Sequence, residues 1–290
     1  MKIAVFGGSG FLGSYVVREL IKRKHKVIVY DIKNFKSNSD VIYVTLDILD
    51  KKALTTQFEK HKFDIVYNFA GFANLDKSCD YPNETFELNV IGNLNILNAI
   101  VKKDIKRFVY ASSAYAMSNK GSFYGISKLA SEKIVEEYAT KFDLQYTILR
   151  YGSIYSEKRF DNNYIYNLIE KALEKLSINH QGNGEEVREY IHAFDAASLS
   201  VDVIENEKFK NTHLILTGVD KIKRIELFNM IKEITNEPID ISLKKEGYNN
   251  HYALSPYSFS PEVSQKLLPN PHIDIGQGIL NCIKEVKAKK

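Results

Sequence analysis

Tyr124 and Lys128 are the two side chains whose types and spacing suggest chemistry most directly, in the segment Tyr-Gly-Ile-Ser-Lys. Residues four apart share one face of a helix, so both side chains would point the same way. A nearby ammonium stabilises a phenolate and lowers the pKa of the tyrosine, which predicts that Tyr124 exchanges a hydroxyl proton near neutral pH. The same spacing is common on surface helices, so the place of this helix in the fold must decide whether the pair is catalytic.

Ser112 and Ser113 directly follow the β-rich run Phe108–Ala111, upstream of this pair. In an open α/β sheet, the carboxyl ends of the strands face the ligand crevice. A serine hydroxyl at that edge can hydrogen-bond a substrate oxygen as the oxygen gains or loses charge. The alternative for either serine is a turn or a helix cap.

A glycine-rich loop follows the first apolar run, Ile3–Phe6, and opens a helical pattern. Gly7–Gly13 reads Gly-Gly-Ser-Gly-Phe-Leu-Gly, which fits GxGxxG from Gly8 and GxxGxxG from Gly7. Between a strand and a helix this pattern predicts a dinucleotide site, because glycines let the backbone turn tightly and approach a pyrophosphate. The helix start adds free N–H groups and the positive end of the helix dipole.

Asp31 ends the second β-rich run, Val27–Tyr30. A carboxylate there can accept hydrogen bonds from both ribose hydroxyls and would repel a 2′-phosphate, which favours NAD over NADP. Lys33 and Lys36 lie close enough to weaken this preference, and a turn-forming or capping role for Asp31 is the alternative.

Strand and helix patterns alternate over the first half of the chain, and apolar runs of this kind indicate a parallel sheet covered on both faces. The further expected strands are Val41–Leu46, Ile65–Phe69 and Tyr146–Leu149, and the expected helices lie near Lys51–Lys60, Asn83–Lys102 and Phe123–Thr140. The predicted fold is therefore α/β, with a doubly wound parallel (Rossmann) sheet. We expect residues 1–150 to hold the cofactor and the catalytic side chains.

Residues 151–290 are expected to form mainly a small substrate-binding lobe, interleaved with the end of the sheet. The expected helices are Asn163–Leu176, Phe194–Ile204, Ile225–Ile234 and Ile275–Val286, and the expected strands are Val187–Ile191 and Leu214–Leu216.

The composition suits a globular protein: 290 residues, 44% of them hydrophobic, with a net charge of only +4 spread along the chain. This predicts no nucleic-acid binding, and no apolar run approaches the length of a membrane span. Cys79 and Cys282 lie far apart, which predicts reduced thiols in the cytoplasm, and Met1–Phe6 does not read as a secretory leader. No metal-ligand spacing occurs among the histidines, which we expect to be surface or core residues, His25, His61, His180 and His192 among them.

Taken together, these motifs resemble the extended short-chain dehydrogenase/reductases, the NAD-dependent epimerase/dehydratase family. Gly7–Gly13 resembles its GGxGxxG loop, and Leu149–Tyr155 is similar to LRYxNVYG. Further matching segments are Asp47-Ile48 near the adenine, Asn68–Gly71 after the fourth strand, Asn89–Leu94 (NVxGTxN), Arg188–His192 (RDxxHV), and Ser260–Leu268 with Ile273–Ile279 near the C-terminus.

The resemblance implies roles for individual residues. Ser113, Tyr124 and Lys128 would form the catalytic trio, with Lys128 also holding the nicotinamide ribose. Besides Tyr124 and Lys128, NAD would be bound by Gly7, Gly10, Phe11, Leu12, Gly13, Asp31, Asp47, Ile48, Phe69, Ala70, Gly71, Asn89 and Gly152. Substrate would be bound by Ser113, Ser153 and Arg188, with Arg188 on the diphosphate of a nucleotide sugar. A surface pairing of Arg188 with Glu185, Glu186 or Glu189 is the alternative.

The leading functional hypothesis is a nucleotide-sugar epimerase acting through a keto intermediate. The alternatives are a nucleotide-sugar reductase or dehydrogenase, then a 4,6-dehydratase, then a non-catalytic NAD-binding protein. The dehydratase ranks lower because Ala114-Tyr115 follows Ser113, where that branch carries two carboxylates. The family resemblance also implies a homodimer that pairs the helices over Asn83–Lys102 and Phe123–Thr140. The sequence departs from the family pattern at several positions, so the identity of the sugar stays open. These departures are Ser153 for the family's Asn, Ser156 for its Gly, Met117-Ser118 for its Tyr-Gly, and a short gap before Tyr124.

Overall fold

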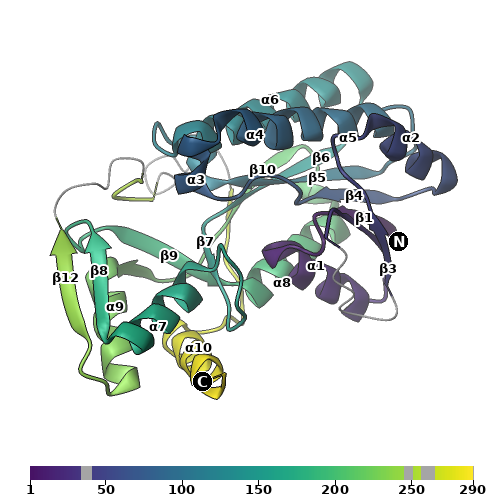
Figure 1. The fold of residues 1–290 in the computed structure, drawn as a ribbon. Coiled ribbons are helices and arrows are strands. Elements are labelled where there is room, and N and C mark those ends of the chain that lie inside the picture. The colour runs from purple at the N-terminus through teal and green to yellow at the C-terminus, as the bar shows by residue number, and fades with distance from the viewer. Residues whose placement is uncertain (34–40, 245–250, 256–264, 290) are drawn as a thin grey trace.

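Eight parallel strands form the central sheet of the computed structural model (Figure 1), which describes residues 1–33, 41–244, 251–255 and 265–289. In sheet order these strands are β13 (Gln265–Leu267), β10 (Thr212–Leu216), β6 (Tyr146–Tyr151), β5 (Arg107–Ser113), β4 (Ile65–Asn68), β1 (Lys2–Phe6), β2 (Lys26–Asp31) and β3 (Ile42–Thr45). The order reverses at β1, which lies between β2 and β4, and ligands bind at such a switch point.

Helices cover both faces of the sheet (Figure 1), which explains why its strands are apolar without alternation. On β1, Ile3 and Val5 pack into one core while Ala4 and Phe6 pack into the other, since successive strand residues face opposite sides. The first core is closed by α1 (Phe11–Lys22) and α8 (Ala193–Glu205), and the second by α2 (Lys51–Lys60), α5 (Gly92–Ile100) and α6 (Ser122–Phe142).

A smaller lobe lies below the sheet in Figure 1 and has its own apolar core. It contains the strands β7 (Ser153–Tyr155), β8 (Ser177–Gln181), β9 (Val187–His192), β11 (Lys221–Lys223) and β12 (Asp240–Lys244), with the helices α7 (Tyr164–Lys175), α9 (Arg224–Thr235) and α10 (Ile275–Ala288). Since β10, β13 and α8 come from the same half of the chain and pack with the main sheet, the chain passes repeatedly between the two parts. The predicted doubly wound fold is confirmed.

The structure differs from the sequence-based prediction in its short elements. The long helix expected over Asn83–Lys102 consists of α4 (Pro82–Phe86), the π-helical turn η1 (Glu87–Ile91) and α5. At this π-helical turn the Asn89 carbonyl accepts a buried hydrogen bond at 2.7 Å from the Ser131 hydroxyl on α6, a side-chain contact of the kind that accompanies such turns. The sequence-based prediction missed α3 (Leu75–Asp80), the 3₁₀ turns η2 (Ala114–Met117) and η3 (Glu207–Phe209), and the short strands β7, β8, β11, β12 and β13.

Candidate functional site

The glycine-rich segment that joins β1 to α1, Gly7–Gly13, forms a cradle that is lined mainly by backbone atoms. Gly7 has φ +75°, and a Cβ there would lie 2.5 Å from the backbone nitrogen of Ala70. A Cβ on Gly13 would collide with the carbonyl of Gly7. Gly10 is the N-cap of α1 and supplies no side chain to cap the first N–H groups of the helix. Phe11 and Leu12 begin the helix, so this cradle fits a pyrophosphate at a helix N-terminus.

The Asp31 carboxylate, at the end of β2, faces this loop. Its Oδ2 accepts from the backbone N–H of Ser9 at 3.0 Å, and its Oδ1 accepts from that of Lys33 at 3.0 Å. The glycine loop thus holds the carboxylate beside the cradle, where the predicted ribose would lie. Lys36 lies outside the described residues.

Two further segments predicted to contact the cofactor surround the cradle. Asp47 is exposed and accepts from the N–H of Leu49 at 2.9 Å, while Ile48 is buried against α5. After β4, the partly buried Phe69 and Ala70 lead into Gly71, whose φ is +148°.

Asn89 holds that second loop in place. Its Oδ1 accepts from the N–H of Phe72 at 2.7 Å, and its Nδ2 donates to the Phe72 carbonyl at 3.0 Å and to the Ser127 hydroxyl at 2.9 Å. These bonds occupy both ends of the buried amide, so Asn89 fixes the loop that follows β4.

The trio Ser113, Tyr124 and Lys128 comes together at the carboxyl end of β5 and the start of α6. Ser113 ends β5, and its Oγ accepts from the N–H of Tyr115 at 3.2 Å, so it also caps η2. Lys128 is 6% exposed, and its Nζ donates to the Ala111 carbonyl at 2.9 Å. The same Nζ lies 5.9 Å from the centre of the Tyr124 ring. The predicted shared helix face is therefore present.

The expected effect of Lys128 on Tyr124 is not found in this structure. Burial raises the pKa of Tyr124, and a hydrogen bond with Ser113 opposes that rise. Burial also lowers the pKa of Lys128 to about 8, with Glu132 opposing. The expectation was wrong because the ammonium donates to the Ala111 carbonyl rather than to the phenol, and because burial disfavours both charged forms.

A buried ion pair behind the trio was missed in the sequence. Glu132, one turn beyond Lys128 on α6, is 0% exposed and accepts from Arg150 of β6 through both carboxylate oxygens, at 2.9 and 2.7 Å. The Ser112 hydroxyl donates to the same carboxylate, so Ser112 belongs to this network while Ser113 faces Tyr124. The spacing Tyr124, Lys128, Glu132 at i, i+4 and i+8 could have pointed to Glu132.

A cavity of about 750 Å³ opens between the two parts of the molecule. It brings together Ser153 and Arg188, which are far apart in sequence and are two of the three residues expected to bind substrate; the third, Ser113, is not among its lining residues. The other lining residues are Ala73, Asn74, Leu75, Asp76, Tyr115, Asp161, Asn162, Tyr164, Asn167, Leu168, Lys171, Asn179, His180, Gln181, Arg224 and His251. Beside the cavity, the Gly152 N–H donates to the Leu216 carbonyl at 2.9 Å, which fixes the turn from β6 into β7.

Arg188 and Arg224 are two buried guanidinium groups in the wall of this cavity, 2% and 8% exposed. Arg188 lies over the Tyr252 ring and Arg224 over the Tyr164 ring, each with its Cζ 4.1 Å from the ring centre. Arg224 was missed because it matches no motif; the antiparallel pairing of β11 with β9, which sets Ile222 opposite Arg188, brings it near.

The carboxylates offered as surface partners for Arg188 form ion pairs elsewhere. Glu185 pairs with Lys223 at 2.7 Å, and Glu189 pairs with Lys266 at 2.7 Å. Glu186 bonds His180 at 3.0 Å. His180 is buried against Phe228 of the smaller lobe's core, as expected of a core histidine, and it also forms part of the cavity wall.

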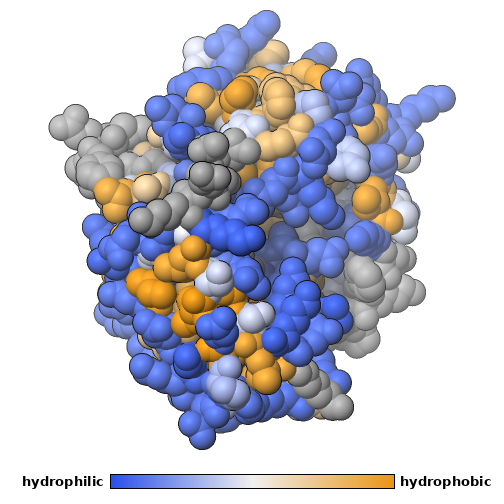
Figure 2. Space-filling view, turned by 60° about the vertical axis from the view of Figure 1, so that its left-hand side comes forward, coloured by the Kyte–Doolittle hydropathy of each residue, from blue (hydrophilic) through white to orange (hydrophobic). Residues whose placement is uncertain are grey.

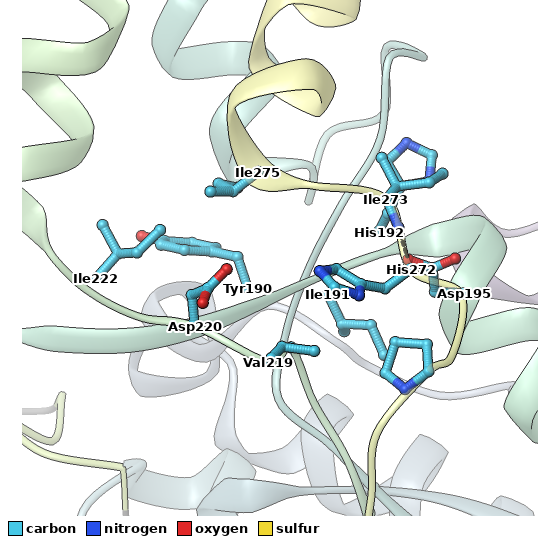
Figure 3. Close-up of a pocket in the computed structure, with 12 residues that line it drawn as sticks. Tyr190, Ile191, His192, Asp195, Val219, Asp220, Ile222, His272, Ile273 and Ile275 are labelled. Carbon is cyan, nitrogen blue, oxygen red and sulfur yellow. Dashed lines mark hydrogen bonds between the residues drawn. The ribbon is translucent and has the colours of Figure 1, made fainter.

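Figure 3 shows a second, far smaller cavity of about 10 Å³, beside β9 and the start of α8. A space of this size holds roughly one water. His192 in its wall accepts from the N–H of Phe194 at 3.2 Å and bonds Glu157 at 3.0 Å, so it caps α8. Asp195 accepts from the N–H of Ile273 at 2.8 Å. No predicted site residue lines this cavity, and His192 is a structural histidine, as expected.

The fold and the site together define an enzyme of the doubly wound α/β class, with a dinucleotide cradle and a Ser/Tyr/Lys trio at one edge of the sheet. The chain belongs to the NAD-dependent epimerase/dehydratase family, whose model matches residues 3–216. This confirms the family predicted from the motifs. NAD is the cofactor of this family, and the cradle at Gly7, Gly10 and Gly13 fits it.

Two curated relatives resemble the chain along most of their length. It is 31% identical to UDP-glucose 4-epimerase of Halalkalibacterium halodurans over 85% of each chain. It is 26% identical to putative UDP-glucose 4-epimerase of Methanocaldococcus jannaschii over 98% of each. Among solved structures, UDP-glucose 4-epimerase of Thermotoga maritima with UDP-glucose has a TM-score of 0.86 and 24% identity, covering 100% of this chain and 99% of that one, and so shares the fold.

Within the described ranges, no helix has the length and apolar character needed to cross a bilayer. In the same ranges, no group of three or more His, Cys, Asp or Glu side chains is arranged to hold a metal ion.

Proposed function

We propose that this protein is an NAD-dependent nucleotide-sugar epimerase that works through a transient keto sugar. The observation that carries the proposal is the cavity of about 750 Å³, whose wall includes Ser153, two buried arginines of the smaller lobe, and Tyr115, which contacts the Tyr124 ring. Its size suits a ligand as large as a nucleotide sugar. The relatives named UDP-glucose 4-epimerase make a UDP sugar the first candidate.

In this mechanism the residues of the trio handle the proton. NAD held by the glycine cradle would supply the redox chemistry, hydride transfer to and from a sugar carbon. Tyr124 removes the proton from the hydroxyl on that carbon and gives it back after the keto sugar has turned over. Ser113 bonds the same sugar oxygen, and Lys128 holds the nicotinamide ribose. The remaining candidate residues of the glycine cradle and its neighbouring loops bind NAD, and Ser153 contacts the sugar.

The retained cofactor tests this proposal against the reductase alternative. An epimerase regenerates its NAD in every cycle, whereas a reductase or dehydrogenase exchanges the cofactor. We expect about one NAD per chain after gentle purification, measured by mass spectrometry, and turnover without added cofactor. An enzyme that is purified empty and needs stoichiometric reduced cofactor would support the alternative.

We propose that Arg188 and Arg224 bind the diphosphate of the substrate. A guanidinium can contact two phosphate oxygens at once, and a dianion would compensate two cations that are taken out of water. The tyrosine under each guanidinium holds its plane in place. Both guanidinium groups line the same cavity, so one diphosphate bound there would meet both.

Arg188→Lys is expected to raise the apparent KM for a nucleotide sugar by at least tenfold and to leave NAD binding unchanged. Lysine keeps the charge but cannot reproduce the planar, bidentate contact. Arg159, whose side chain is 69% exposed in an ion pair with Glu170, gives a matched control, because Arg159→Lys should leave KM unchanged. Free sugars should be poor substrates, since binding of the nucleotide helps to drive the chemical step. Equal turnover of free and nucleotide-linked sugar would refute this role.

NAD is expected to bind more tightly than NADP, because the Asp31 carboxylate held at the glycine loop would repel a 2′-phosphate. Asp31→Ala should reduce the difference between the affinities for NAD and NADP, mainly by improving NADP binding. Titration of both cofactors at one salt concentration measures this. Equal or stronger binding of NADP to the unchanged protein would show that Asp31 does not select the cofactor.

We further propose a homodimer, with residues 1–150 binding the cofactor and residues 151–290 mainly the substrate. Phe123, Ile126 and Leu129 are exposed apolar side chains on α6, and Ile91 is exposed on the adjacent η1. Figure 2 shows hydrophobic side chains near the top of the molecule, at the level of these helices in Figure 1. Contact between this face and a second copy of the chain would remove these apolar side chains from water. Sedimentation of the wild type and of Ile126→Glu tests the pairing.

A further inference from the structure

Three side chains form a hydrogen-bonded series along the cavity wall. The Tyr115 hydroxyl lies 2.9 Å from Nδ1 of His251, and Nε2 of His251 lies 2.9 Å from Oδ1 of Asp76. All three residues line the cavity of about 750 Å³. They come from η2, from the segment 251–255 and from α3, so the fold assembles the series from separate parts of the chain.

The chemistry of the three groups determines which donates and which accepts each hydrogen bond. An ionised carboxylate only accepts, and the hydrogen bond from His251 lowers the pKa of Asp76 and keeps it ionised. Nε2 of His251 therefore donates to Asp76, and the tautomer with its proton on Nε2 leaves Nδ1 as the acceptor for the Tyr115 hydroxyl. A weak acid bonded to a base, which is oriented by a third group, is the arrangement that activates a side chain for proton transfer.

Tyr115 lies beside the trio and is held firmly there. Its ring meets that of Tyr124 edge to face, with centroids 6.3 Å apart. Gly121, at φ +99°, leaves room for it, since a Cβ there would lie 2.7 Å from the Tyr115 ring. Because the two phenol rings occupy different places, Tyr115 would reach a different atom of a sugar whose hydroxyl is held by Tyr124.

We propose that Tyr115, with His251 and Asp76 behind it as positioning residues, is a second acid–base group that removes and returns a proton at the sugar carbon next to the transient carbonyl. The inference rests on the proposed function, which supplies that carbonyl. It extends the substrate class to nucleotide sugars that are inverted at a carbon beside the oxidised one.

The proposed step involves no net oxidation. The Tyr115 hydroxyl proton moves to Nδ1 of His251, and Asp76 stabilises the resulting imidazolium. The phenolate oxygen then takes the proton from the carbon, the C–H electron pair forms the carbon–carbon double bond, and the carbonyl π pair moves to oxygen as an enolate. Reversal of these steps returns a proton to the carbon, and the configuration is inverted when the enolate has turned its other face to Tyr115 before it is reprotonated.

Deuterium uptake tests this step separately from the redox step. We would incubate the holoenzyme in D₂O with UDP-4-keto-6-deoxyglucose, in which the carbonyl is already present, and follow the protons on the two neighbouring carbons by NMR. We expect uptake well above the rate in buffer alone. Tyr115→Phe, which keeps the ring packing, should lower it by about 10²–10⁴-fold, the usual contribution of a general acid–base group.

Two further variants separate chemistry from folding. Tyr138→Phe makes the same chemical change where the hydroxyl bonds Asn98 on the outer helices, and it should exchange like the wild type. Asp76→Asn alters a side chain that is 76% exposed, so it should fold normally and exchange more slowly. Absence of uptake by the wild type, or equal uptake by Tyr115→Phe, would overturn the inference. Epimerisation without deuterium uptake would leave the proposed function standing.

Discussion

Tyr124→Phe is expected to lower turnover of a nucleotide sugar by about 10²–10⁴-fold while the fold and NAD binding are retained. In the proposed mechanism the phenol takes the hydroxyl proton; it lies next to Ser113, with Lys128 Nζ 5.9 Å from its ring centre. Phenylalanine keeps the ring and removes only the hydroxyl. Steady-state kinetics, with circular dichroism and NAD titration as checks, measure the effect.

The matched control for this variant is Tyr138→Phe, which removes a hydroxyl from the other end of the same helix. It should retain wild-type activity. A Tyr124→Phe enzyme with near-normal turnover on its true substrate would remove Tyr124 from the mechanism and direct attention to Tyr115 as the principal acid–base group.

Glu132→Leu is expected to destabilise the protein by about 3–5 kcal/mol, because it leaves the Arg150 guanidinium buried without its carboxylate. Glu132 is 0% exposed and Arg150 is 4% exposed, so water cannot take the place of the lost partner. Urea unfolding measures the change in the free energy of unfolding, provided that the m value, its dependence on urea concentration, is the same for both proteins.

The double variant Glu132→Leu with Arg150→Met provides the control for the ion pair. Replacing both charges with apolar side chains removes the uncompensated cation, so it should recover much of the lost stability. If the single and double variants are equally unstable, packing at this position rather than the buried charge is the cause. A Glu132→Leu protein as stable as the wild type would show that the ion pair contributes little.

Local sequence patterns predicted the parts of the site that local backbone geometry creates. The strand–glycine–helix order placed Gly7–Gly13 correctly, and the four-residue spacing placed Tyr124 and Lys128 on one helix face. Both follow from periodicities within a single segment. The family motif also singled out Arg188, which lies in the cavity wall, although nothing in its immediate sequence neighbourhood indicated that it would be buried.

Contacts between distant segments could not be predicted in this way. Glu132 meets Arg150 only because α6 packs over β6, and Arg224 approaches Arg188 only because β11 pairs with β9. His251 reaches Tyr115 from a segment 136 residues away. The pKa of Tyr124 was mispredicted for a related reason: its direction depends on burial, which the helix spacing does not reveal.

Interconversion of a nucleotide sugar without consumption of cofactor tests the central claim most directly. The purified holoenzyme would be incubated with UDP-glucose, and with a panel of other nucleotide sugars, while NMR follows the sugar and absorbance follows reduced cofactor. The account predicts that one substrate is converted to a mixture with its epimer, with no added NAD and no net reduced cofactor. Conversion that stops after one equivalent of cofactor has been reduced or oxidised would contradict it and identify a one-way oxidoreductase.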